Sequence, residues 1–178
     1  MFEKLRILFY YVVFKYFHRF NSIRCLEKYQ NKKLKHLIKK VSIKSKFYNK
    51  LKIEKFQNIP IIDKKELMEN FNIINTVNMK LDEAFNVSIK GEISRNFKPK
   101  VGKYTVGLSS GTSGHRGVFI VSDKERCMWT GAILARCLYS SIFHKYKIAM
   151  FLRADSNLYQ TIGSKNISFK YFDMYNNI

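Results

Sequence analysis

The residues that could do chemistry gather in one short segment, Leu108 to Gly117, which places Gly111, Gly114 and Gly117 among hydroxyl side chains. Glycine permits positive φ and lets the backbone approach a ligand closely. Successive backbone N–H groups in such a turn can surround phosphate oxygens, and an arginine adds a fixed cation suited to phosphate. The segment therefore predicts a phosphate-binding loop at 108–117. Its candidate ligands are Ser109, Ser110, Gly111, Thr112, Ser113, Gly114 and Arg116.

Two other known motifs share features with this loop, and each of them requires a helix directly after the motif. A Walker A loop requires G-x-x-x-x-G-K-[ST] before a helix, and the sequence has neither this spacing nor this ending. Gly107 to Gly111 matches the G-x-S-x-G of hydrolases, but that motif must turn directly into a helix. Here more glycines and a strand-like segment follow. A flexible loop without a ligand stays open as an alternative, and we expect His115 to be a solvent-exposed loop residue.

The segments around the loop predict an α/β arrangement. Ser122 and Glu125 form an S-x-x-E capping box, which predicts a helix from Asp123 to about Ser140. A short helix from Ser156 to Ile162, ended by Gly163, is expected further on. Strands are predicted at Tyr104–Leu108, Val118–Val121, Lys147–Leu152 and Ile167–Phe172.

The first part of the chain is expected to be mostly helical. Apolar residues near one face predict a helix from about Ile23 to Ser45. Pro60 favours an extended conformation at the residue before it, and Asp63 can cap a short helix over Lys64–Asn70. Another short helix is predicted over Leu81–Ile89, ending near Gly91.

The N-terminal segment Met1–Phe20 is aromatic and apolar, with cations interrupting it. Its longest apolar run, Ile7 to Phe14, has eight residues, whereas a membrane-spanning helix needs about 20. We expect this segment to pack within a protein. Peripheral contact with an anionic membrane is the alternative.

Charge and cysteine content limit the classes of function. There are 33 Lys and Arg residues against 13 Asp and Glu, a net charge of +20, which first suggests nucleic acid or an anionic membrane. The lysines are spread along the chain, however, and many other residues also have AT-rich codons, so biased composition explains much of the excess. The three cysteines and four histidines show no pattern of a disulfide framework or a structural zinc site. A reduced, cytoplasmic setting is expected.

Several segments resemble one enzyme family in the same order along the chain. Ser109–Gly114 resembles the phosphate-binding loop of the adenylate-forming superfamily, approximately [ST]-S-G-[ST]-[TS]-G-x-P-K. Ile59–Leu67 is similar to the I-P-x-x-x-K-x-x-L segment of the phenylacetate–CoA ligase and coenzyme F390 synthetase branch. Tyr104–Lys124, Ser45–Tyr48 and Phe151–Tyr159 look like the F390-synthetase-like proteins found with capsule and surface-polysaccharide genes.

The resemblance implies an ATP-dependent enzyme that activates a carboxylate as an acyl-adenylate, releases pyrophosphate and often passes the acyl group to a thiol. ATP and Mg²⁺ are the implied cofactors, with the loop holding the β- and γ-phosphates. Arg116 and Gly117 stand where the family pattern has Pro and Lys. The family's adenine, ribose, magnesium and catalytic-lysine segments have no counterpart up to Ile178, so we expect a truncated relative without catalytic residues or Mg²⁺ ligands of its own.

The predicted organisation is a helical region over residues 1–58, followed over 59–178 by an incomplete α/β sheet of the adenylate-forming N-terminal domain. The carboxylate substrate is not identified by the sequence. The alternative function is a basic module that contacts a membrane surface or nucleic acid without catalysis. The lysines spread over the whole chain and do not gather in one stripe, which favours biased composition over a designed binding surface. We do not expect a nucleic acid partner, and membrane contact, if any, is expected through Met1–Phe20.

Overall fold

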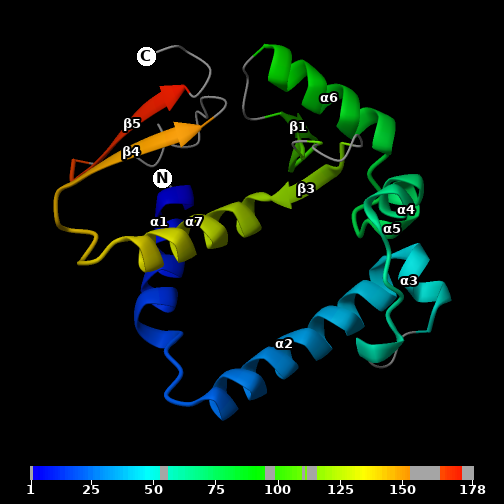
Figure 1. The fold of residues 1–178 in the computed structure, drawn as a ribbon, viewed down its shortest axis with the longest axis horizontal. Coiled ribbons are helices and arrows are strands. Elements are labelled where there is room, and N and C mark those ends of the chain that lie inside the picture. Colours follow the sequence, from blue (N-terminus) through cyan, green and yellow to red (C-terminus); the bar gives the residue numbers. More distant parts are fainter. Residues whose placement is uncertain are drawn as a thin grey trace. The chain divides into compact units, whose positions relative to one another are not determined.

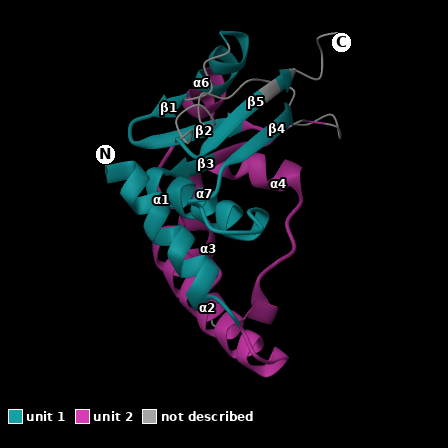
Figure 2. Ribbon diagram, turned by 90° about the vertical axis from the view of Figure 1, so that its left-hand side faces the viewer, with its two compact units in different colours: residues 1–19, 87–107, 120–178 teal, residues 20–86, 108–119 magenta. Residues whose placement is uncertain are grey.

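A computed structural model describes residues 2–52, 56–94, 99–109, 111, 116–152 and 165–173. The chain forms two compact units (Figure 2). Unit 1 contains Met1–Arg19, Val87–Gly107 and Ile120–Ile178, and unit 2 contains Phe20–Asn86 and Leu108–Phe119. Each unit draws residues from both of the predicted regions, 1–58 and 59–178. Within the described residues, no helix is long and apolar enough to cross a membrane.

In unit 1, helix α1 (Phe2–Val12) packs against helix α7 (Asp123–Cys137), and the two are seen together in Figure 1. α1 continues into a π-helical turn, η1 (Val13–Phe17). The core is built around Tyr11 of α1, with residues of α7 and of the strand that begins at Ile167. The N-terminal segment therefore packs within the protein through this face, as predicted.

The described strands form two sheets. In the first, β1 (Lys100–Val101), β2 (Tyr104–Leu108) and β3 (Val118–Ser122) lie in the order β1-β2-β3. In the second, β4 (Tyr146–Leu152) and β5 (Ile167–Asp173) pair in parallel, with Tyr146 opposite Ile167 (Figure 1). The mixture of helix and sheet confirms the α/β class. The two-residue strand β1 was not predicted, because so short a strand has no detectable periodicity.

Unit 2 is mainly helical, and hydrogen bonds at the helix starts fix its elements. Ser22 caps the long helix α2 by accepting a hydrogen bond from the Cys25 N–H. Ser45 is fully buried, caps the next helix through the Tyr48 N–H, and donates its hydroxyl to the carbonyl of Ile73. The elements are α2 (Ile23–Lys44), α3 (Lys46–Lys50), η2 (Phe56–Asn58), α4 (Lys64–Glu69), α5 (Phe71–Ile74) and α6 (Leu81–Ile93), of which α6 runs on into unit 1.

Three predicted helix ends were wrong. α6 continues through Gly91 to Ile93, because Gly91 is buried within the helix and does not serve as a C-terminal stop. α4 ends at Glu69, with Asn70 as its C-cap. α7 ends at Cys137 and not near Ser140, because Leu138 leaves the helix with φ −79° and ψ 118°. The helix predicted over 156–162 and its stop at Gly163 lie outside the described residues.

Candidate functional site

Helix α4 is held at its first residue by a side-chain cap. The Asp63 carboxylate accepts a hydrogen bond of 2.7 Å from the Glu66 N–H, as predicted. A cap of this kind typically stabilises a helix by about 1 kcal/mol. Lys64 and Met68 are four residues apart and therefore lie on one face of α4. That face meets the start of β3, where the Val118 N–H lies 3.3 Å from the Met68 sulfur.

The loop predicted to bind phosphate is closed at its base by paired hydrogen bonds. The Ser109 N–H donates to the Gly117 carbonyl at 2.8 Å. In return, the Gly117 N–H donates to the Ser109 hydroxyl oxygen, also at 2.8 Å. Both residues therefore hold the ends of β2 and β3 together where the loop leaves the sheet. Ser109 is a closing residue of the loop, and its hydroxyl oxygen already accepts a backbone hydrogen bond.

Arg116 lies across the described part of the loop. Its Nε is 3.4 Å from the Ser109 carbonyl oxygen, to which it donates. Gly111 has φ +68°, in the left-handed region that favours glycine. A Cβ at Gly111 would lie 2.8 Å from the Arg116 Cγ. Glycine is therefore required at 111 both by the backbone and by the arginine stem that packs on it.

A second cation, Lys64, reaches the same place from α4. A Cβ at Gly117 would lie 3.5 Å from the Lys64 Cε and 3.5 Å from the Ser109 hydroxyl oxygen. The sequence prediction of ligands missed Lys64, because 45 residues separate it from Ser109. The available signal was its place as the lysine of the I-P-x-x-x-K-x-x-L segment.

Three of the predicted site residues, Ser109, Gly111 and Arg116, are brought together by this geometry. The other four lie outside the described residues, as does His115: they are Ser110, Thr112, Ser113 and Gly114. The described part of the site thus consists of a closed loop base with one guanidinium and one ammonium stem beside it. Its chemistry suits an anion with several oxygens.

The fit to the implied cofactors differs between phosphate and metal. Cationic side chains and a glycine-rich turn suit the phosphates of ATP. Mg²⁺ prefers carboxylate and other oxygen ligands, and no group of three His, Cys, Asp or Glu side chains that could hold a metal ion occurs among the described residues. The described cations and the glycine-rich turn therefore suit phosphate groups.

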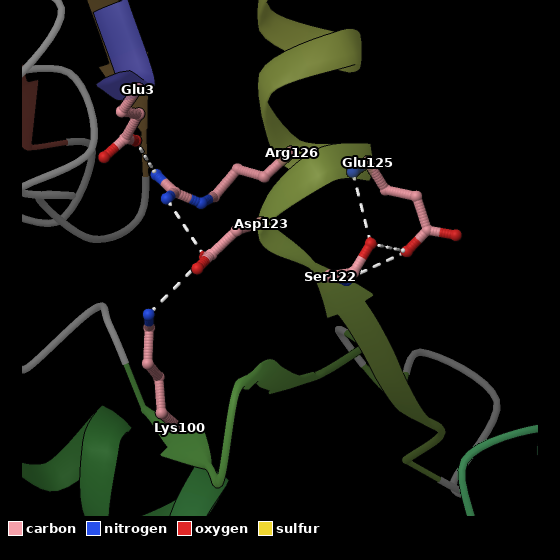
Figure 3. Close-up of polar contacts among 6 residues, drawn as sticks. All are labelled: Glu3, Lys100, Ser122, Asp123, Glu125 and Arg126. Atoms are coloured by element: carbon pink, nitrogen blue, oxygen red, sulfur yellow. Dashed lines mark hydrogen bonds and ion pairs between the residues drawn. The ribbon is translucent and has the colours of Figure 1, made fainter. Parts of the chain in front are cut away.

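A separate polar cluster in unit 1 joins α1 to α7 (Figure 3). Arg126 contacts Glu3 of α1 at 2.6 Å and Asp123 at 3.2 Å, and Lys100 lies 3.4 Å from the same Asp123 carboxylate. Burial raises the pKa of Asp123, but the hydrogen bond from Arg126 and the charges of Lys100 and Arg126 outweigh it, so the pKa is lowered overall. These side chains pair with one another, which gives the cluster a structural role.

The predicted capping box of α7 is confirmed beside this cluster (Figure 3). The Ser122 hydroxyl oxygen accepts from the Glu125 N–H at 3.2 Å, and the Glu125 carboxylate accepts from the Ser122 N–H at 2.9 Å. This reciprocal pair satisfies two N–H groups at the helix start. It fixes the point at which β3 becomes α7.

Comparisons with protein-family models, curated proteins and solved structures give no match for this chain. The family resemblance of the segments around Pro60 and Ser109 therefore stays a prediction. What bears on function is the geometry of the chain's own residues.

Proposed function

We propose that the loop at 108–117 binds the β- and γ-phosphates of ATP in a relative of the adenylate-forming, CoA ligase-like enzymes, with a link to capsule or surface-polysaccharide biosynthesis. The observation that carries the proposal is the convergence of Arg116 and Lys64 on the loop base formed by Ser109 and Gly117. These cations come from separate segments, both of which resemble the family.

The physical basis is charge and shape. A guanidinium presents donors in a fixed fork, whereas an ammonium is a compact charge on a flexible stem. Together they can hold a diphosphate at two of its groups. Charge-assisted hydrogen bonds of this kind are roughly twice as strong as neutral ones, so two of them support measurable affinity at this half-buried site.

ATP supplies the phosphoanhydride whose cleavage activates the carboxylate: the carboxylate oxygen bonds to the α-phosphorus, and pyrophosphate leaves with the bonding electrons. The residues described here hold the phosphate end and keep it in place. No residue of the chain is assigned to the transfer itself, so the activity proposed for this chain is nucleotide and pyrophosphate binding.

The test is a titration of the full chain with ATP and, separately, with pyrophosphate, followed by amide NMR. We expect saturable shifts at Gly111 and Gly117. Arg116→Gln and Lys64→Gln should each weaken binding about tenfold. The matched control is Lys65→Gln, because Lys65 is exposed beside Lys64 and pairs only loosely with Glu69, at 4.0 Å. No shift at millimolar ATP, or equal losses in all three variants, would exclude the proposal.

A specific observation supports the alternative, contact with an anionic membrane surface. The outer face of α1 and η1 carries large apolar side chains spaced three and four residues apart, as on one helix face. Their exposed fractions are 80% for Phe2, 57% for Leu5, 61% for Phe9, 37% for Val12 and 54% for Tyr16. We call this face the α1 stripe.

The charges around the α1 stripe also suit anionic lipid. Lys4 and Arg6 are exposed on α1, and the single acid of this helix, Glu3, is paired with Arg126. An interfacial helix combines such an apolar stripe with cations at its margins. Co-sedimentation with phosphatidylcholine vesicles, with and without phosphatidylglycerol, tests this. Phe9→Ser should reduce binding to the anionic vesicles. Phe56→Ser, at a similarly exposed site of unit 2, should leave binding unchanged. Membrane contact through the α1 stripe is ruled out if binding does not weaken with salt, or if neither substitution changes it.

A further inference from the structure

The positive charge of helix α2 is unevenly placed around its axis. At about 100° per residue, the positions 24, 28, 32, 35, 39 and 42 fall within one arc of roughly 80°. All but one of them carry a cation, and the exception is Ser42. Lysine is frequent along the whole chain, but on this helix the expectation of dispersed lysines does not hold. We call these cations the α2 row: Arg24, Lys28, Lys32, Lys35 and Lys39.

The α2 row is exposed and has no anionic partner within the described residues. Each of its members is exposed, and none of the ion pairs between described residues includes one of them. The single acid of α2, Glu27, lies outside the arc. Successive members of the row are three or four residues apart, and like charges at this spacing destabilise a helix. An anionic surface would relieve this repulsion.

The α2 row lies away from the packed side of this long helix (Figure 1). Leu34, Ile38 and Val41 line a groove together with residues of α3 and η2, so this face of α2 meets the rest of unit 2. The row is centred roughly 130° around the helix from that face. From Arg24 to Lys39 it extends about 22 Å, at a rise of 1.5 Å per residue. The cations therefore form a straight line that stays open to a partner.

The shape and composition of the row favour a flat anionic surface over a nucleic acid. A straight row of about 22 Å is longer than the width of the major groove of DNA, about 12 Å, so its middle cations would face the groove and not a phosphate. The row has no aromatic side chain for stacking on bases and a single arginine for base edges. An anionic lipid surface is flat and can contact every cation of the row at once.

An acidic protein helix is a weaker match for the row than lipid. Exposed ion pairs contribute little to binding, because two long side chains must be held in one geometry. The core of a protein interface is normally apolar, and no apolar side chain lies in the arc of the row. A lipid surface needs no such core. Clusters of about four to eight Lys or Arg on a helix are typical of anionic lipid binding, and each contributes roughly fivefold to the affinity.

We propose that the α2 row binds the headgroups of an anionic phospholipid surface, with α2 lying along the surface. This contact is purely electrostatic and differs from that of the α1 stripe, whose apolar side chains would enter the lipid. The α1 stripe belongs to unit 1 and the α2 row to unit 2, so each contact can be tested without the other. The inference does not depend on the proposed ATP binding.

The test is co-sedimentation of the full chain with phosphatidylcholine vesicles, with and without phosphatidylglycerol. Glutamine replaces lysine with little change in helix propensity, and the row variant combines Lys28→Gln, Lys32→Gln and Lys35→Gln. The matched control loses the same charge from the other side of the same helix: it combines Lys33→Gln, Lys40→Gln and Lys44→Gln.

We expect the row variant to lose roughly a hundredfold in affinity for the anionic vesicles. The control variant should lose far less, because its lysines lie about a helix diameter from the surface, which is close to the Debye length at physiological salt. Equal losses in the two variants would overturn the proposal. So would a failure of the unsubstituted chain to bind the anionic vesicles at low salt.

Two further comparisons separate other sources of binding. Duplex DNA of mixed sequence replaces the vesicles in the first, and we expect both triple variants to lose affinity for it equally. DNA binding that only the row variant weakens, with vesicle binding unchanged, would overturn the proposal in favour of a nucleic acid. The second uses Phe9→Ser. Vesicle binding that this substitution abolishes and the row variant leaves unchanged would overturn the proposal and leave the α1 stripe as the membrane contact.

A footprint on the unsubstituted chain guards against variants that fold differently. Saturating anionic vesicles should slow the acetylation of the lysines of the α2 row by N-hydroxysuccinimidyl acetate severalfold, as read by peptide mass spectrometry. Lys33, Lys40 and Lys44 are exposed on the same helix and should react at nearly the same rate with and without vesicles. Protection of neither set of lysines, or of both sets equally, would overturn the proposal.

Discussion

The contact between α1 and α7 depends on Gly131, and replacing this residue by alanine tests how closely the two helices approach. A Cβ at position 131 would lie 2.6 Å from the Tyr10 Cβ, 2.8 Å from the Ile7 carbonyl oxygen and 2.8 Å from the Tyr11 N. Ordinary contacts between carbon atoms are about 3.5 to 4.0 Å. The helices must therefore separate by roughly 1 Å to accept one methyl group.

Two opposing terms set the size of the effect. Alanine is intrinsically better than glycine inside a helix by about 1 kcal/mol. Overpacking typically costs about 1 to 3 kcal/mol, and the upper part of that range applies because Ile7 and Tyr11 present backbone atoms that cannot rotate away. We expect Gly131→Ala to lower the free energy of unfolding by about 1 to 2 kcal/mol. The shift of α1 would also lengthen the 2.6 Å contact between Glu3 and Arg126.

The assay is urea unfolding followed by the emission of Trp129, which lies in α7 and reports on unit 1. The control is Ala132→Gly, which measures the intrinsic helix term next to Gly131, with an expected cost of about 1 kcal/mol. Loss of stability in both variants supports the close approach, because helix propensity alone predicts opposite signs. A higher urea midpoint for Gly131→Ala would refute it.

Four further predictions use other parts of the chain. Asp63→Ala should cost about 1 kcal/mol of stability through loss of the α4 cap, measured by urea unfolding followed by circular dichroism. The pKa of Asp123 is lowered from 3.8, so its stabilising effect is present above that value and is lost as the pH falls through the folded-state pKa. We therefore expect the urea midpoint of the unsubstituted chain to fall in this acid range, and the midpoint of Asp123→Asn to fall less. Burial raises the pKa of the Cys127 thiol, with the charge of Glu3 adding to it, so a disulfide reagent should modify the two exposed cysteines rapidly and Cys127 only on unfolding. Finally, Gly117→Lys should restore pyrophosphate binding to Lys64→Gln in the NMR titration, and failure to do so would show that position 117 cannot direct a cation to the loop.

The start of α7 could be predicted from the sequence, and its end could not. At the start, Ser122 and Glu125 hold each other through hydrogen bonds within four residues, so the signal is local. At the end, Leu138 turns out of the helix, is 5% exposed and joins the core with Tyr11. Its carbonyl accepts from Lys15 at 2.8 Å. Partners more than 100 residues away decide this helix end, and no pattern near Leu138 shows them.

The candidate loop likewise has features that the sequence predicts and features that it does not. Glycine at 111 and the cation at 116 follow from the local pattern, and the structure gives both a role, since the Arg116 stem packs on Gly111. Lys64 does not follow from the local pattern of the loop, because it is 45 positions away from Ser109 in the sequence and comes beside Gly117 only through the placement of α4.

The loop differs from the family pattern at Gly117, and the structure suggests a physical reason for this difference. That position carries a lysine in the pattern, and here the space where its side chain would begin lies 3.5 Å from the Lys64 Cε. The Lys64 side chain from α4 therefore lies beside the position at which the family pattern has its lysine. Lys64 is positioned by a helix that the Asp63 cap and the contact between Met68 and Val118 hold in place. The proposed phosphate binding would therefore require a folded unit 2, because a peptide of the loop alone would lack the Lys64 charge.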